Sequence, residues 1–243
     1  MEMWRCYLEQ LADREGDLEG QIVAAAYHAA DVLGFLSRTL DREGKDSALI
    51  DQRIAYFEEG VKRAEGFGDC LITAGFTIYN HINTLCRQFA SGNSESERLI
   101  HQIEKQVQLR TRGSDTIERA AAAMRAVFPM VSLMTLILDQ DGTMTQVIRQ
   151  IEQRFSSGAN RAGTPWEHLL NSLYRTVEMM QLFVLLSDPE LKDQVQQIAA
   201  QFEEDDQPSD LKMKLRNGFC RLFELGHLIT LHLDEILDPG RSA

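Results

Sequence analysis

The stretch "LIHQIEKQV", Leu99–Val107, has a near copy further along the chain in "VIRQIEQRF", Val147–Phe155. In both stretches the apolar residues recur at intervals of three and four, the spacing that places side chains on one face of an α-helix. A shared glutamine lies roughly opposite that face, where packing does not require it. The pair therefore predicts two amphipathic helices of similar design.

The same pattern occurs four times along the chain. It consists of an apolar anchor, a glutamine two residues later and an apolar residue seven residues after the anchor, and the anchors lie 50, 48 and 47 residues apart. The four sets are Ile50, Gln52 and Phe57; Ile100, Gln102 and Val107; Ile148, Gln150 and Phe155; and Val195, Gln197 and Phe202. Each set follows a more apolar segment, so the pattern predicts four helical hairpins, each with a long apolar helix, a polar turn and a shorter amphipathic helix. Amphipathic helices between short loops can also align in this way without a common origin.

The rest of the chain indicates an all-α fold. No run of alternating β-branched residues bounded by hairpin turns interrupts the helical spacing. Capping boxes predict several helix starts, and Pro165 occupies the first helical position after Thr164. The predicted boxes are Ser94 with Glu97, Asp115 with Glu118, Thr143 with Gln146, Thr164 with Glu167, and Ser187 with Glu190. We expect about nine or ten antiparallel helices, arranged as a helical-hairpin repeat with a period of about 47–50 residues or as a multi-helix bundle.

The 243 residues are expected to form one continuous domain in three parts. Residues 1–20 are predicted to be an N-terminal helix or cap, residues 21–205 the four hairpins, and residues 206–243 a C-terminal capping helix. The most apolar stretch, Ala120–Leu138, contains Arg125 and Pro129 and is predicted to be a buried central helix instead of a membrane span.

Charge and cysteine usage narrow the expected partners and location. The formal net charge is −12, and the 25 basic residues form no block that could follow a phosphate backbone, so nucleic-acid binding is disfavoured. The four cysteines are scattered, without a CxxC pair, and the chain does not open on a signal sequence. These features are typical of a protein of the reducing cytosol.

No recognisable pattern predicts a catalytic or cofactor site. The chain has no GxSxG elbow and no glycine-rich phosphate loop. Its single Glu-x-x-His pair, Glu224 with His227, is half of what a di-iron helix bundle requires. We therefore expect no metal and no cofactor, and a non-enzymatic protein is favoured over an enzyme.

The candidate partner-binding residues lie on the last helix and on an earlier apolar one. Glu224, His227 and Asp234 share one face of the otherwise apolar last helix and form a thin polar stripe. Met179 and Met180 are adjacent, so they cannot face the same way, and one of them is expected to be partly exposed. The alternative interpretation of the stripe is the solvent edge of a buried terminal helix.

Together these features favour a cytosolic protein–protein interaction protein, such as an adaptor, a chaperone-like binder or a regulatory scaffold, that presents a helical groove to another protein. The alternative is a helical enzyme or ligand sensor that holds a small molecule, haem or metal between helices through residues such as His28, His81 or His227. Apolar helix faces can also close on a second copy of the chain, so the sequence does not separate a monomer from a homo-oligomer.

Overall fold

The computed structural model describes residues 18–111, 115–201 and 210–232. Within these residues the chain forms nine α-helices, one short 3-10 helix and no strand, so the predicted all-α fold is confirmed. The helices are α2 (Leu18–Leu40), α3 (Ser47–Arg63), α4 (Phe67–Phe89), α5 (Ser94–Thr111), α6 (Thr116–Leu138), α7 (Thr145–Arg161), α8 (Pro165–Ser187), η1 (Pro189–Leu191), α9 (Lys192–Gln201) and α10 (Leu211–Leu231). Most of the predicted N-terminal part, residues 1–17, lies outside the described residues.

Four long helices set the period of the predicted hairpin repeat. The helices α2, α4, α6 and α8 each contain 23 residues. They begin at residues 18, 67, 116 and 165, so a long helix starts every 49 residues. The shorter helices α3, α5, α7 and α9 begin at residues 47, 94, 145 and 192, and this spacing is uneven because the preceding turns differ in length.

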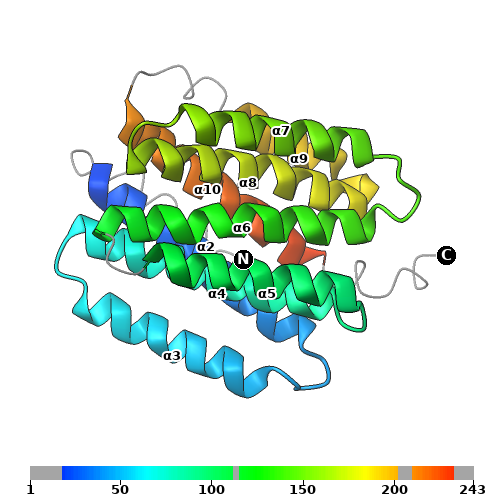
Figure 1. Cartoon of the computed structure of the whole chain (residues 1–243), viewed down its shortest axis with the longest axis horizontal. Helices are drawn as coiled ribbons and strands as arrows, with labels where there is room; N and C mark the ends of the chain where they lie inside the picture. Colours follow the sequence, from blue (N-terminus) through cyan, green and yellow to red (C-terminus); the bar gives the residue numbers. More distant parts are fainter. Residues whose placement is uncertain (1–17, 112–114, 202–209, 233–243) are drawn as a thin grey trace.

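The long helices and α10 enclose the core as a closed ring. In this ring α2 packs on α4, α4 on α6, α6 on α8, α8 on α10, and α10 on α2, and the helices lie alongside one another in Figure 1. Residues near the helix starts meet, because Glu19 of α2 pairs with Lys212 of α10. Phe67 of α4 likewise stacks on Trp166 of α8, with 5.9 Å between ring centroids. The ring helices therefore run in the same direction, with their N-termini at one end.

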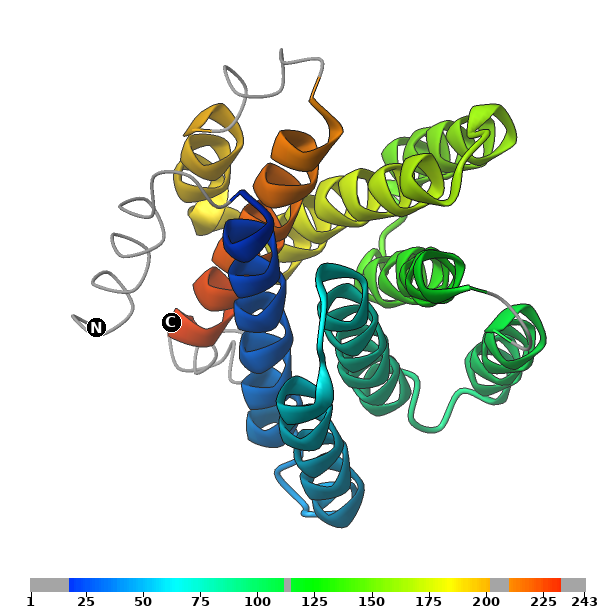
Figure 2. The same cartoon turned by 90° about the vertical axis from the view of Figure 1, so that its left-hand side faces the viewer.

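The shorter helices lie outside this ring, as Figure 2 shows for α3, α5 and α7. Each packs chiefly on the long helix that follows it, α3 on α4, α5 on α6 and α7 on α8. A Cβ added at Gly60 would lie 2.8 Å from Thr73 Cγ2, and one added at Gly158 would overlap the Asn171 side chain. These close approaches let α3 and α7 pack more tightly on the next hairpin than on their own.

The first three helices recur as a unit 98 residues later, since α6, α7 and α8 have the bounds of α2, α3 and α4 after that shift. In the turns after α2 and α6, an aspartate carboxylate, Asp41 or Asp139, accepts two hydrogen bonds of 2.7–3.1 Å from the N–H five residues on and the hydroxyl six residues on. A glycine follows three residues after each aspartate, Gly44 with φ of 67° and Gly142 with φ of 72°. Helices α2–α4 and α6–α8 therefore form two copies of the same three-helix arrangement.

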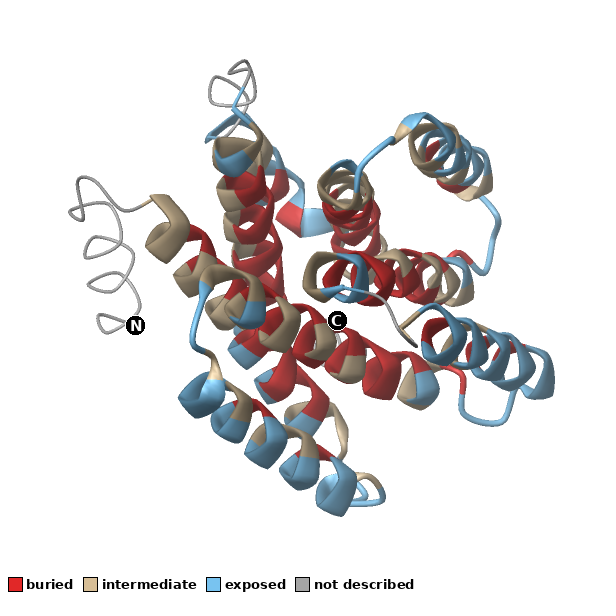
Figure 3. Cartoon of the chain, turned by 60° about the vertical axis from the view of Figure 1, so that its left-hand side comes forward, coloured by how far each residue is buried: buried red, intermediate tan, exposed pale blue. Residues whose placement is uncertain are grey.

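Burial agrees with the four predicted sets of residues. The anchors Ile50, Ile100 and Ile148 are fully buried, and Val195 is 4% exposed. The glutamine two residues after each anchor is exposed. Figure 3 shows the buried residues concentrated on the ring helices and the exposed ones on the outer faces of the shorter helices. The last residue of the fourth set, Phe202, lies outside the described residues.

The predicted central helix is α6, which packs on α4 and α8. Within the described residues it is the one helix long and apolar enough to cross a membrane, and 67% of its most apolar window is buried inside the protein. That the chain has no membrane span stays a prediction.

Both candidate methionines are buried, with Met179 0% and Met180 2% exposed. The prediction that one of them is partly exposed is wrong. Because the ring is closed, α8 is covered by α6, α7 and α10, and adjacent side chains that point in different directions both contact protein.

Candidate anion-binding pocket

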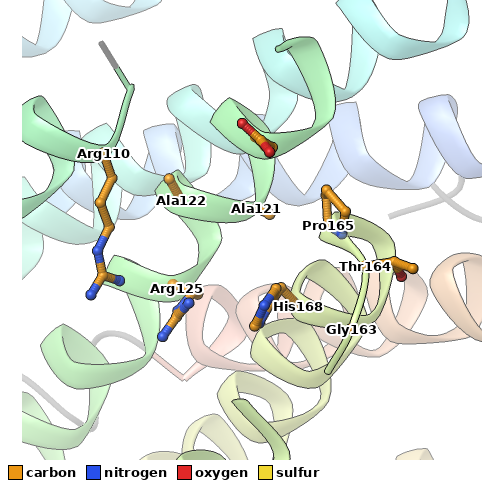
Figure 4. Close-up of a pocket in the computed structure, with 9 residues that line it drawn as sticks. Arg110, Ala121, Ala122, Arg125, Gly163, Thr164, Pro165 and His168 are labelled. Carbon is orange, nitrogen blue, oxygen red and sulfur yellow. The ribbon is translucent and has the colours of Figure 1, made fainter. Parts of the chain in front are cut away.

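A cavity of about 290 Å³ lies where the end of α5 meets the first turns of α6 and α8. Figure 4 shows the side chains of Arg110, Arg125 and His168 around this space, one from each helix. The full lining is Arg110, Glu118, Ala121, Ala122, Arg125, Gly163, Thr164, Pro165 and His168. We refer to this cavity as the basic pocket, because two guanidinium groups and an imidazole share it in a chain whose net charge is −12.

The spacing of residues on α6 shapes one wall of the basic pocket. Ala121 and Arg125 are four residues apart and so lie on the same helix face. The small side chains of Ala121 and Ala122 leave space beside α8 that larger residues would fill. Arg125 is half-buried at this wall, with its guanidinium facing the space in Figure 4.

The start of α8 supplies the opposite wall. The Thr164 hydroxyl accepts a hydrogen bond of 3.2 Å from the Glu167 N–H, and the Glu167 carboxylate accepts from the N–H groups of Gly163 and Thr164 at 2.7 and 3.0 Å. This confirms the capping box predicted at Thr164. The capping box fixes the first turn of α8, and His168 follows it directly.

The predicted capping box at the start of α6 is only half formed. The Asp115 carboxylate accepts a hydrogen bond of 2.8 Å from the Glu118 N–H, as predicted. The Glu118 carboxylate returns no hydrogen bond to the described part of the chain and lines the basic pocket instead.

The other three predicted capping boxes are wrong. Asn93 caps α5 in place of Ser94, Met144 precedes α7 without a capping side chain, and Asp188 caps η1 in place of Ser187.

The cations of the basic pocket destabilise one another. Burial lowers the pKa of Arg125, and the nearby Arg110 cation lowers it further. Burial also lowers the pKa of His168, followed by the effect of Arg125. The Nδ1 atom of His168 is buried and has no hydrogen-bond partner within the described residues. An anion in the pocket would stabilise all three side chains.

The equivalent contact in the first half of the chain is neutral. Positions 98 residues before Arg125 and His168 hold Tyr27 and Cys70. These two residues also meet between a pair of ring helices, α2 and α4. Burial raises the pKa of Tyr27, and the neighbouring Cys70 raises it further. The same helix packing is thus achieved without any charge.

The contact between α4 and α6 has a third combination of side chains at the same place in the repeat. Positions 49 residues before Arg125 and His168 hold Phe76 and, on α6, Arg119. There the Arg119 guanidinium lies over the Phe76 ring, 5.9 Å from its centroid. Arg119 therefore has an aromatic partner, whereas Arg125 makes no ion pair or hydrogen bond with the described residues.

The described residues that the sequence singled out for partner binding lie in two different environments. Glu224 and His227 are half-buried on α10, where the His227 ring stacks on Phe223 with centroids 6.0 Å apart. Burial raises the pKa of Glu224 and lowers that of His227. Asp234 lies outside the described residues, and Met179 and Met180 belong to the core.

The histidines considered as ligands also lie in different environments. His81 is 1% exposed, and burial lowers its pKa to about 4, with a smaller effect from Arg53. His28 lies against Phe223, with 5.8 Å between ring centroids. In the described part of the chain, no three His, Cys, Asp or Glu residues come together in a way that could hold a metal ion.

Sequence analysis alone did not identify the basic pocket. It treated Arg125 as an interruption of an apolar stretch, and His168 belongs to none of the predicted stripes. A comparison of residues 49 and 98 positions apart would have revealed them. It pairs Arg125 and His168 with an uncharged pair at the longer distance and with an arginine and a phenylalanine that stack on each other at the shorter one.

The fold does not connect this chain to a characterised group of proteins. No family model, no curated protein and no solved structure matches it. Its function is therefore argued from the basic pocket.

Proposed function

We propose that this protein is a binding protein whose basic pocket holds the carboxylate or phosphate group of a small molecule. The observation that carries the proposal is the convergence of Arg110, Arg125 and His168, from three helices, on one cavity in an acidic chain. Guanidinium groups donate paired hydrogen bonds whose geometry matches carboxylate and phosphate oxygens. An imidazole adds one further donor.

The size of the pocket suits a small ligand. It lies at the end of the ring where the long helices begin, next to the first turn of α8, where the N–H groups of Gly163 and Thr164 already donate to the Glu167 carboxylate. Its volume of about 290 Å³ is at the lower end of the range for ligand sites, which suits a small molecule.

The ligand sensor considered from the sequence is therefore favoured, at a different site from the histidines first considered. Binding to another protein, a cytosolic location and association of two copies stay predictions. Phe35 and Leu231 are exposed apolar side chains, 57% and 52% exposed, and nothing in the structure indicates what would cover them.

A calorimetric titration with inorganic phosphate tests this proposal. Arg125→Gln is expected to weaken phosphate binding roughly tenfold or more, because a charge-assisted hydrogen bond contributes about 1.5–3 kcal/mol. Arg119→Gln is the matched control. It removes the same charge from the same helix, but the Arg119 guanidinium lies over the Phe76 ring and does not line the basic pocket. Equal phosphate affinities in the wild type and both variants would contradict the proposal.

A further inference from the structure

One exposed acidic residue lines the basic pocket together with the cations. Glu118 lines the cavity from the first turn of α6, seven residues before Arg125. A separation of seven residues is about two helical turns, which puts both side chains on one face, about 10 Å apart along the helix axis. Glu118 makes no ion pair with the described residues.

The surface between these two charges is apolar. Ala121 and Ala122 lie between Glu118 and Arg125 on α6, with exposures of 4% and 8%, and Pro165 faces them from α8. None of these three side chains can donate or accept a hydrogen bond. The pocket therefore presents an acid at one end, an apolar middle and two bases with an imidazole at the other end.

Helix capping does not explain the position of the Glu118 carboxylate. Asp69 and Glu167 occupy the same place in the repeat, 49 residues before and after Glu118. The Glu167 carboxylate folds back to accept from the N–H groups of Gly163 and Thr164. Glu118, which is exposed, makes no such hydrogen bond to the described start of α6 and lines the cavity.

Resting on the function proposed above, we infer that the ligand is dipolar, with an ammonium group at Glu118 and a carboxylate or phosphate at Arg125 and His168, joined by a short aliphatic chain. Such molecules are ω-amino acids and aminoalkyl phosphates. A ligand with an anionic group at both ends is disfavoured, because its second group would lie against the Glu118 carboxylate. Selectivity thus comes from Glu118, and general anion affinity from the cations.

The test compares 6-aminohexanoate with hexanoate, which has the same chain and carboxylate but no amine. We expect calorimetry to give at least tenfold tighter binding of 6-aminohexanoate to the wild type. Glu118→Gln is expected to remove most of this preference. It should weaken the binding of 6-aminohexanoate and leave the affinity for hexanoate unchanged or higher. Asp69→Asn, at the equivalent place on α4 and exposed to solvent, is the matched control and is expected to keep the preference.

The outcomes separate this inference from the proposed function. Equal wild-type affinities for the two probes, no binding of either, or a preference that survives Glu118→Gln would overturn the dipolar ligand. Phosphate binding that still depends on Arg125 in such a case would leave the anion site standing. If phosphate also fails to bind the wild type, the anion site and the dipolar ligand are both wrong.

Discussion

Arg125 and His168 distinguish the basic pocket from the equivalent contact in the first half of the chain. Tyr27 and Cys70 hold those positions 98 residues earlier, and the helices around them have the same lengths and bounds. Burial and the neighbouring Arg125 both lower the pKa of His168, so the protonated imidazole is disfavoured unless a negative charge lies nearby. Because the same helix packing forms around Tyr27 and Cys70, packing alone does not require Arg125 and His168, whereas a bound anion would pair with both.

His168 is expected to make anion binding depend on pH. Burial lowers its pKa below the ordinary value of 6.5; Arg125 and Arg110 lower it further and Glu167 opposes them. Glu118 is the remaining titratable group of the lining. A bound anion favours the protonated imidazole, so binding takes up a proton. Anion affinity therefore rises as the pH falls, until His168 is protonated in the free protein as well.

Sulfate is a suitable probe for this effect, because its charge stays constant between about pH 8 and about pH 5.5. Calorimetry is expected to show sulfate affinity rising over this range in the wild type and rising less steeply in His168→Gln. Identical pH profiles for the two proteins would show that His168 does not take up the proton.

At the scale of elements, the turn between α6 and α7 depends on one glycine. Gly142 has a φ of 72°, a conformation that costs other residues about 1–2 kcal/mol. Gly142→Ala is therefore expected to lower the free energy of unfolding by about 1 kcal/mol or more, measured by urea denaturation.

Gly66→Ala is the control for this substitution. Gly66 has a φ of −150°, and a Cβ added there would meet no atom within 4 Å. Because Gly66 is the N-cap residue of α4, where alanine is less favourable than glycine, this variant is expected to lose about 0.5 kcal/mol, less than Gly142→Ala. If both variants lose the same stability, the backbone conformation of the turn is not what Gly142 provides.

The elements themselves were largely predictable from the sequence, because each depends on residues close together in the chain. Ile100 and Ile148 marked the buried faces of α5 and α7, and Thr164 with Glu167 marked the start of α8. The burial of Met179 and Met180 was not predictable, since it depends on how α6, α7 and α10 surround α8. Neither was the packing of each shorter helix on the following long one.

At the scale of the whole molecule, the closed ring brings distant residues to one end. The ring helices run in the same direction, and the basic pocket lies at the end of the ring where α6 and α8 begin. Arg110, Arg125 and His168 come from three helices and meet only because α5 and α8 both pack on α6 at this end. No local pattern in the sequence predicts that meeting, which is why the pocket was missed.

The repeat supplies the most direct test of the central claim, that Arg125 and His168 serve ligand binding and not folding. The double variant Arg125→Tyr/His168→Cys gives the second half of the chain the residue pair found at Tyr27 and Cys70. Calorimetric titration of this variant with inorganic phosphate is the deciding measurement, with a thermal unfolding curve to establish that it is folded. We expect the double variant to unfold at the same temperature as the wild type and to show no detectable phosphate binding. Phosphate binding at wild-type affinity by the folded double variant would contradict the account.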